Sequence, residues 1–204
     1  MELTIEMAKN WLLLTNEAIQ ENKSYLTKLD QAIGDGDHGI NMARGFSEVK
    51  AKIEHQSYDN VAEMMKDTAM TLLSKVGGAA GPLYGTAFLR ISQDWQGKAT
   101  INEETIISGL KAGMEGMKQR GKAETGEKTL IDLWEPVIAA AEENFSADII
   151  QSTAKEAFEA TRDMQATKGR ASYLGVRSVG HLDPGSCSSY YLFSALADSV
   201  KGAE

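Results

Sequence analysis

Residues 30–41 read Asp30-Gln31-Ala32-Ile33-Gly34-Asp35-Gly36-Asp37-His38-Gly39-Ile40-Asn41 and interrupt a chain whose apolar residues otherwise recur with helical spacing. Asp30, Asp35 and Asp37 fall within eight residues and are separated by glycines. Carboxylates this close repel one another unless a cation relieves the repulsion. Mg²⁺ prefers such hard oxygen ligands and usually shares its shell with water and phosphate oxygens. The three aspartates are therefore candidate ligands of a hard cation.

Other interpretations of the same stretch compete with a metal site. Asp37 could serve only as the N-cap of a helix that begins at Gly39, or the stretch could be a solvated turn of aspartate and glycine. An EF-hand calcium loop fails on spacing. The twelfth position counted from Asp35 is Phe46 rather than Glu, and the count from Asp37 places Met42 at the required glycine.

On both sides of this stretch the apolar residues recur at three- and four-residue spacing, as Met7, Trp11, Leu14 and Ala18 do. The strict alternation of apolar and polar residues that is typical of strands is absent. The pattern predicts about eight helical segments, at residues 4–28, 39–53, 58–74, 82–95, 102–119, 128–144, 148–166 and 184–201.

The three prolines refine the predicted segments. Pro82 and Pro184 follow loop residues and suit the first turn of a helix, where the missing N–H costs nothing. Asp183 is then a natural N-cap of the last helix. Pro136 falls inside a helical pattern and marks either a kink or a later helix start.

Composition predicts one compact domain over residues 1–204 and argues against several classes of protein. Charged residues make up 25% and hydrophobic residues 42%, an ordinary globular balance. The net charge is −8 and the basic residues are scattered, whereas a nucleic-acid-binding protein needs a basic stripe. No apolar run approaches the roughly 18 residues of a membrane span, and the N-terminus lacks a signal-peptide pattern. We expect a cytoplasmic protein that binds neither nucleic acid nor membrane.

Two single residues have simple interpretations. Cys187 is the only cysteine, which excludes an internal disulfide and fits a reducing compartment. No base lies beside it in the sequence, so we interpret it as a small packing residue. His38 lies inside the acidic stretch, where neighbouring carboxylates should favour its charged form.

Glycines gather between the predicted helices in five groups, at residues 34–39, 77–81, 121 with 126, 169 with 175, and 180 with 185. A helix N-terminus offers unpaired N–H groups, and glycine lets a ligand approach the backbone closely. Each group alone could simply end a helix, but together with the aspartates and Arg170 they favour a phosphate-binding end of a bundle. A near match to a P-loop at residues 116–123 is rejected, because Ala123 stands where that motif needs Ser or Thr.

At these residues the chain resembles the L-subunit family of dihydroxyacetone kinases, which includes the nucleotide-binding domain of single-chain kinases. The resemblance runs through most of the chain. It is carried by residues 29–39, 77–86, 121–123 with 126–129, 169–175, and 180–181 with 183–185. Any one of these groups would be weak, whereas five in order at such spacings are specific.

The resemblance implies an all-α barrel of about eight antiparallel amphipathic helices, with a nucleotide site formed by loops at one end. It implies that Asp30, Asp35 and Asp37 hold two Mg²⁺ ions that bridge the diphosphate of tightly bound ADP or ATP. The residues that would bind the nucleotide are His38, Gly39, Ile40, Asn41, Gly78, Ala79, Ala80, Gly121, Thr129, Leu130, Arg170, Asp183, Pro184 and Gly185. Arg170 is the candidate catalytic residue, which would stabilise charge on the transferring phosphoryl group. Many relatives have serine where Ala80 stands, so a hydroxyl contact to phosphate is missing here.

The resemblance also implies partners. In members that depend on the phosphotransferase system, ADP stays bound as a coenzyme and a phosphohistidine M subunit recharges it to ATP. The L subunit then passes the phosphoryl group to dihydroxyacetone held on a K subunit. This chain has the L module alone, which favours the multi-subunit system. Two alternatives stay open, namely a component of an ATP-dependent kinase for dihydroxyacetone or a partner-bound acid, and a nucleotide-bound regulator of a transcription factor. Assembly as a homodimer also stays open.

Overall fold

The structure is a computed structural model that describes residues 1–201. Within them the chain forms nine α-helices: α1 (Ile5–Glu21), α2 (Lys23–Ile33), α3 (His38–His55), α4 (Val61–Lys75), α5 (Ala80–Trp95), α6 (Glu103–Gly121), α7 (Ile131–Glu143), α8 (Ala147–Ala160) and α9 (Pro184–Val200). Two 3₁₀ helices, η1 (Thr161–Asp163) and η2 (Arg170–Ser178), lie between α8 and α9. The predicted all-α fold class is confirmed.

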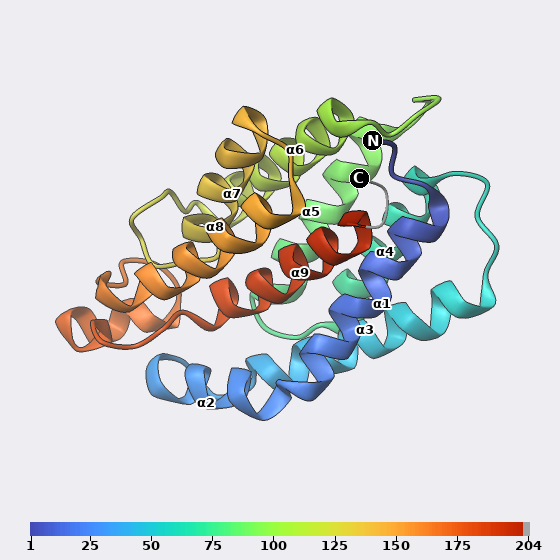
Figure 1. Ribbon diagram of the computed structural model, residues 1–204. Coiled ribbons are helices and arrows are strands. Elements are labelled where there is room, and N and C mark those ends of the chain that lie inside the picture. Colours follow the sequence, from blue (N-terminus) through green and yellow to red (C-terminus); the bar gives the residue numbers. More distant parts are fainter. Residues whose placement is uncertain (202–204) are drawn as a thin grey trace.

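Eight of the helices close a ring. α1 packs against α3, each helix from α3 to α8 packs against the next one, and α9 packs against α1 (Figure 1). α2 lies beside this ring, against α3 and α9. The chain reverses direction from each helix of the ring to the next, so α3, α5, α7 and α9 all begin at one end of the ring, where their first residues line a common pocket. The expected barrel of about eight antiparallel helices is therefore confirmed.

Large apolar side chains fill the interior of the ring. Trp11, Trp95 and Trp134 are all buried, and Phe193 packs edge-on against Trp134 with ring centroids 5.0 Å apart. Fully burying an apolar side chain of this kind contributes roughly 1.5–3 kcal/mol to stability. Cys187 lies in the same interior, and burial raises the pKa of its thiol to about 12. The thiol therefore stays protonated, and its interpretation as a packing residue is confirmed.

The prediction of a single helix at residues 4–28 is wrong. Asn22 ends α1 with φ −102° and ψ 12°, and its side-chain amide donates a hydrogen bond to the Ala18 carbonyl. Asparagine side chains compete in this way with the helical backbone pattern. A separate helix, α2, follows and continues to Ile33, which places Asp30 in its last turn.

The C-terminal half differs from the prediction in the segment between α8 and α9, where η2 was not predicted, and agrees at its final helix. The helix predicted at 148–166 ends at Ala160, where the chain tightens into η1 and the Thr161 hydroxyl donates to the Phe158 carbonyl. Asp183 caps α9 as predicted, since its carboxylate accepts a hydrogen bond from the Ser186 N–H at 2.6 Å. Pro184 is the first residue of that helix, also as predicted.

Pro136 lies inside α7, which runs through it from Ile131 to Glu143. The later helix start that its position allowed is therefore wrong. None of the helices within residues 1–201 has both the length and the apolar character needed to cross a bilayer.

Candidate functional site

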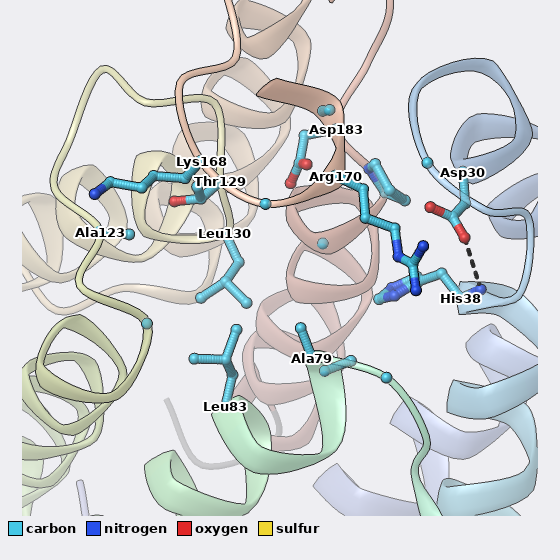
Figure 2. Close-up of a pocket in the computed structure, with 18 of the residues that line it drawn as sticks. Asp30, His38, Ala79, Leu83, Ala123, Thr129, Leu130, Lys168, Arg170 and Asp183 are labelled. Carbon is cyan, nitrogen blue, oxygen red and sulfur yellow. Dashed lines mark hydrogen bonds between the residues drawn. The ribbon is translucent and has the colours of Figure 1, made fainter. Parts of the chain in front are cut away.

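A pocket of about 630 Å³ lies at the end of the ring where α3, α5, α7 and α9 begin. Figure 2 shows Asp30, His38 and Arg170 on one side of this pocket and Leu83 and Leu130 on the other. Pockets of this size hold a small organic ligand. The separation of charged and apolar side chains suits a ligand that carries an anionic group at one end and an apolar ring at the other.

The acidic cluster occupies the charged side. Asp30 is buried, and its Oδ2 accepts hydrogen bonds from the backbone N–H groups of Asp37 at 2.8 Å and His38 at 3.0 Å. One ligand oxygen each from Asp30, Asp35 and Asp37 lies within 4.8 Å of the other two. The structure thus brings together the three carboxylates that the sequence proposed as metal ligands.

The interpretation of Asp37 as only an N-cap is wrong. Asp37 stands at the N-cap position of α3, but its side chain makes no capping hydrogen bond. The carboxylate of Asp30, seven residues earlier in the chain, instead accepts hydrogen bonds from the N–H groups of Asp37 and His38. The Asp37 carboxylate is therefore not used by the helix start.

Two positions in the loop around the cluster require glycine, Gly34 for lack of space and Gly36 for its backbone conformation. A Cβ atom at Gly34 would lie 2.0 Å from Asp30 Oδ1, so any side chain there would push the carboxylate aside. Gly36 has φ +77°, a left-handed conformation that other residues rarely adopt. This cradle and its three hard oxygen donors fit a divalent cation such as Mg²⁺.

His38 differs from its expected charge state. Burial lowers the pKa of its imidazole, and this desolvation outweighs the opposing effects of Asp30 and Asp37. The neighbouring carboxylates do favour the charged form, as expected, but burial outweighs them. The ring Nε2 lies 2.9 Å from Ser188 Oγ on α9, which is in turn 2.8 Å from the Tyr84 hydroxyl on α5. His38 thus connects the acidic loop to two helices of the ring.

Arg170 begins η2 and reaches across the pocket to the acidic cluster. Its Nη2 lies 3.0 Å from Asp35 Oδ2, and both side chains are exposed. An exposed pair of this kind contributes little to stability, about 0–1 kcal/mol. Both partners are therefore free to exchange this contact for an anionic ligand and its cation.

The start of α5 presents unpaired backbone donors to the pocket. The residue before the helix, Ala79, makes no side-chain cap hydrogen bond, and the lining includes Gly78, Ala79 and Ala80. Gly78 has φ +65°, which turns the chain into the helix. The N–H groups of a first helical turn that lacks a cap are available to an anion.

The opposite wall is shaped by Asp132, a buried residue that sequence reasoning missed. Its two carboxylate oxygens accept hydrogen bonds from the N–H groups of Gly126 at 2.5 Å and Thr129 at 2.7 Å. The Ser186 hydroxyl donates to the Thr129 carbonyl at 2.9 Å and so connects this loop to α9. These contacts hold Thr129 and Leu130 in the pocket lining.

Asp183 lies between this wall and α9. Burial raises the pKa of its carboxyl group to about 6, against the opposing effect of its hydrogen bonds to Ser186. The neighbouring Pro184 and Gly185 line the pocket with it. The start of α9 thus carries a carboxyl group that titrates close to neutral pH.

Most of the predicted site residues line the pocket, and two do not. The lining includes Asp30, Asp35, Asp37, His38, Asn41, Gly78, Ala79, Ala80, Gly121, Thr129, Leu130, Arg170, Asp183, Pro184 and Gly185. Gly39 faces α2 instead, where a Cβ atom would lie 2.2 Å from the Lys23 carbonyl oxygen. Ile40 is exposed outside the lining.

Sequence reasoning missed the apolar wall and several basic residues of the pocket. The lining also includes Ile33, Gly34, Gly77, Pro82, Leu83, Met117, Arg120, Ala123, Lys128, Ile131, Lys168, Gly169 and Ala171. Most of these lie in or beside the residue groups that carry the family resemblance, such as 29–39, 77–86 and 169–175, and this is the signal that could have identified them.

Two comparisons with known proteins agree on one family. Residues 32–198 match the family described as the DAK2 domain. The chain is 50% identical over 192 residues to the ADP-binding subunit DhaL of PEP-dependent dihydroxyacetone kinase 1 from Listeria innocua, covering 94% of each chain. It is 49% identical over 199 residues to the ADP-binding subunit DhaL of the PTS-dependent dihydroxyacetone kinase of Lactococcus lactis, covering 97% of this chain and 99% of the relative.

A solved structure has the same fold. The dihydroxyacetone kinase from C. freundii, in complex with AMP-PNP and Mg²⁺, matches 98% of this chain with a TM-score of 0.78 and 23% sequence identity. The matched part makes up 35% of that longer chain.

Proposed function

This chain belongs to the DAK2 domain family, and we propose that it is the ADP-binding subunit of a phosphotransferase-system-dependent dihydroxyacetone kinase. In this role it takes a phosphoryl group from the phosphohistidine of an M subunit onto bound ADP. It then transfers the group to dihydroxyacetone held on a K subunit. The observation that carries the proposal is the pocket, where four helices begin beside one acidic cluster and an apolar wall lies opposite.

The acidic cluster supports a site for two Mg²⁺ ions. Mg²⁺ is usually bound by one or two carboxylates, with water and phosphate oxygens completing its shell. Asp30, Asp35 and Asp37 provide three carboxylates, more than one Mg²⁺ usually binds, so we assign them to two ions. When bound, Mg²⁺ supplies charge neutralisation on the diphosphate and alignment for in-line transfer.

The surrounding groups support one orientation of the nucleotide. Its phosphates would lie beside the acidic cluster at the start of α5, where the first helical turn has no side-chain cap. The base would lie against Leu83 and Leu130 on the apolar side. Arg170 would move from Asp35 to the transferring phosphoryl group, where its guanidinium stabilises the negative charge.

The nucleotide content of the purified protein tests this function first. If ADP is a resident coenzyme, denaturing extensively washed protein should release close to one ADP per chain, measured by chromatography. Recovery of no nucleotide would count against the coenzyme role.

Reconstitution tests the phosphoryl donor. Mixed with K and M subunits and a phosphorylating system, the chain should form dihydroxyacetone phosphate without added ATP. Formation of product only with ATP, and none with the M subunit, would favour an ATP-dependent kinase component instead.

A further inference from the structure

Asn41 is a buried side chain of the pocket lining that is hydrogen-bonded at its oxygen but not at its nitrogen. It lies in the first turn of α3, and its Oδ1 accepts a hydrogen bond from Arg44 Nη2 at 2.8 Å. Within residues 1–201 its Nδ2 has no hydrogen-bond partner, and this nitrogen is not fully buried. Buried polar groups are normally hydrogen-bonded. The N–H donors of this amide therefore suit a ligand that offers acceptor oxygens.

Arg44 decides which end of the Asn41 amide faces the pocket. A guanidinium carries N–H donors and no acceptor, so it binds the oxygen of an amide and never the nitrogen. The guanidinium is itself held by a second contact, because its Nε donates to the carbonyl of Lys75, the last residue of α4, at 2.8 Å. The group is planar and rigid, so fixing Nε also fixes the direction of Nη2. The Asn41 oxygen is thus held toward Arg44, and the nitrogen is left for the pocket.

The amide nitrogen of Asn41 faces the part of the pocket that has both the acidic cluster and a helix start. A Cβ atom on Gly78 would lie 3.8 Å from Asn41 Nδ2 and 3.9 Å from Asp37 Oδ1. Gly78 lies just before the start of α5, whose first turn has no side-chain cap. A Cβ atom on Gly77 would lie 2.8 Å from Asn41 Oδ1, so the amide packs directly against the backbone of this loop. The donor, the carboxylate and the helix start therefore surround one part of the pocket.

We propose that Arg44 is a positioning residue for the phosphates of Mg²⁺–ADP. By holding the oxygen of Asn41, it directs the amide N–H donors toward a phosphate oxygen. This rests on the proposed function. Arg44 is exposed and does not line the pocket, so it acts through Asn41 and not by touching the nucleotide. Without Arg44 the amide is free to reverse, and a reversed amide presents an acceptor oxygen to the phosphate, which repels it.

Titration of the nucleotide-free full chain with ADP and Mg²⁺, followed by calorimetry, tests this role. Arg44→Met and Asn41→Ala should each weaken the ADP affinity by roughly tenfold or more, as loss of a hydrogen bond to a charged group does. Arg44→Lys should bind as poorly as Arg44→Met, because an ammonium keeps the charge but lacks the rigid fork. Arg90→Met is the matched control, since Arg90 is exposed on α5, bonds to Gln93 and lies outside the pocket lining. The control should bind within about twofold of the natural protein.

Two further measurements separate positioning through Asn41 from a general structural role. In an Asn41→Ala background, Arg44→Met should weaken the ADP affinity by less than about twofold, because the residue through which Arg44 acts is gone. The side-chain amide signals of Asn41 in ¹H–¹⁵N NMR, identified by their loss in Asn41→Ala, report the contact directly. They should shift when Mg²⁺–ADP is added to the natural protein, and shift much less in Arg44→Met.

The outcomes distinguish the role of Arg44 from the function of the chain. Natural protein that does not bind Mg²⁺–ADP would overturn the function, and the role of Arg44 with it. Natural protein that binds, together with an Arg44→Met variant of equal affinity, would overturn only the role of Arg44. Full affinity in Arg44→Lys would also overturn it, since charge alone would then suffice. An equal loss from Arg44→Met with and without Asn41 would overturn it as well.

Discussion

Asp35 differs from Asp30 within the acidic cluster, because its carboxylate is exposed and contacts Arg170, whereas that of Asp30 is buried against backbone N–H groups. Asp35→Asn should therefore remove a cation ligand without disturbing a helix start. We expect the affinity for ADP in the presence of Mg²⁺ to fall by about tenfold or more, a loss of about 1.4 kcal/mol or more in binding free energy. Titration calorimetry measures the affinity, and circular dichroism should show unchanged helical content.

Asp94→Asn is the control for this substitution, because Asp94 pairs with Lys98 on the surface and lies outside the pocket lining. It should bind Mg²⁺ and ADP as the natural protein does. Equal nucleotide retention in Asp35→Asn and the natural protein would refute the assignment of Asp35 as a metal ligand.

Asp183 should make stability depend on pH in the direction opposite to most acids. Its pKa is about 6 in the folded protein and 3.8 ordinarily, so the folded state holds the proton more tightly. The contribution of Asp183 to the free energy of unfolding should therefore be fully present below about pH 4 and be lost as the pH rises through about 6. The contribution is at most about 3 kcal/mol, at about 1.4 kcal/mol per pH unit.

Asp183→Asn should remove this decline, since asparagine is also a good N-cap and carries no charge. Denaturant unfolding of both proteins between pH 4 and 7 measures the difference. Asp148→Asn is the control, because Asp148 lies in the first turn of α8 with an exposed side chain. A pH dependence identical in Asp183→Asn and the natural protein would contradict the raised pKa.

At the scale of elements, the η2 segment depends on one amine. Lys128→Met would leave the Met164 and Ser178 carbonyls without their donor while filling a similar volume. We expect faster hydrogen exchange across residues 165–178 and a loss of about 1–2 kcal/mol in unfolding free energy. Lys168→Met is the control, because the Lys168 amine lies 3.9 Å from Glu127 at a partly exposed position. Equal exchange in the two variants would contradict the anchoring role of Lys128.

At the scale of the whole molecule, the pocket joins the starts of four helices that lie far apart in the sequence. A ligand that contacts all four should stabilise the ring as a unit. At a Mg²⁺–ADP concentration 100 times its Kd, the gain is about 2.7 kcal/mol, which raises Tm by about 5–10 °C for a chain of this length. Thermal unfolding of nucleotide-free protein should show this shift, and ADP with a chelator should give a much smaller one. Equal shifts with and without the chelator would argue against a metal in the site.

Features that depend on neighbours along the chain could be predicted from the sequence. Apolar residues recur every three to four positions in a helix, so most helical segments could be predicted from the sequence. Asp183 could be recognised as an N-cap from the proline that follows it. The acidic cluster was equally local, because its three aspartates lie within eight residues. The break at Asn22 escaped this reasoning, because the apolar pattern continues on both sides of a side chain that bonds back to Ala18.

Which of these local features lie close together in space depends on the tertiary fold. Arg170 and Asp35 are far apart in the sequence, as are Lys128 and the two carbonyls that it binds, and no spacing rule connects such positions. The ring of helices brings them to one end and removes water from some of them. This removal of water also explains His38. Burial, which a sequence does not display, lowers the pKa of its imidazole more than the neighbouring carboxylates raise it.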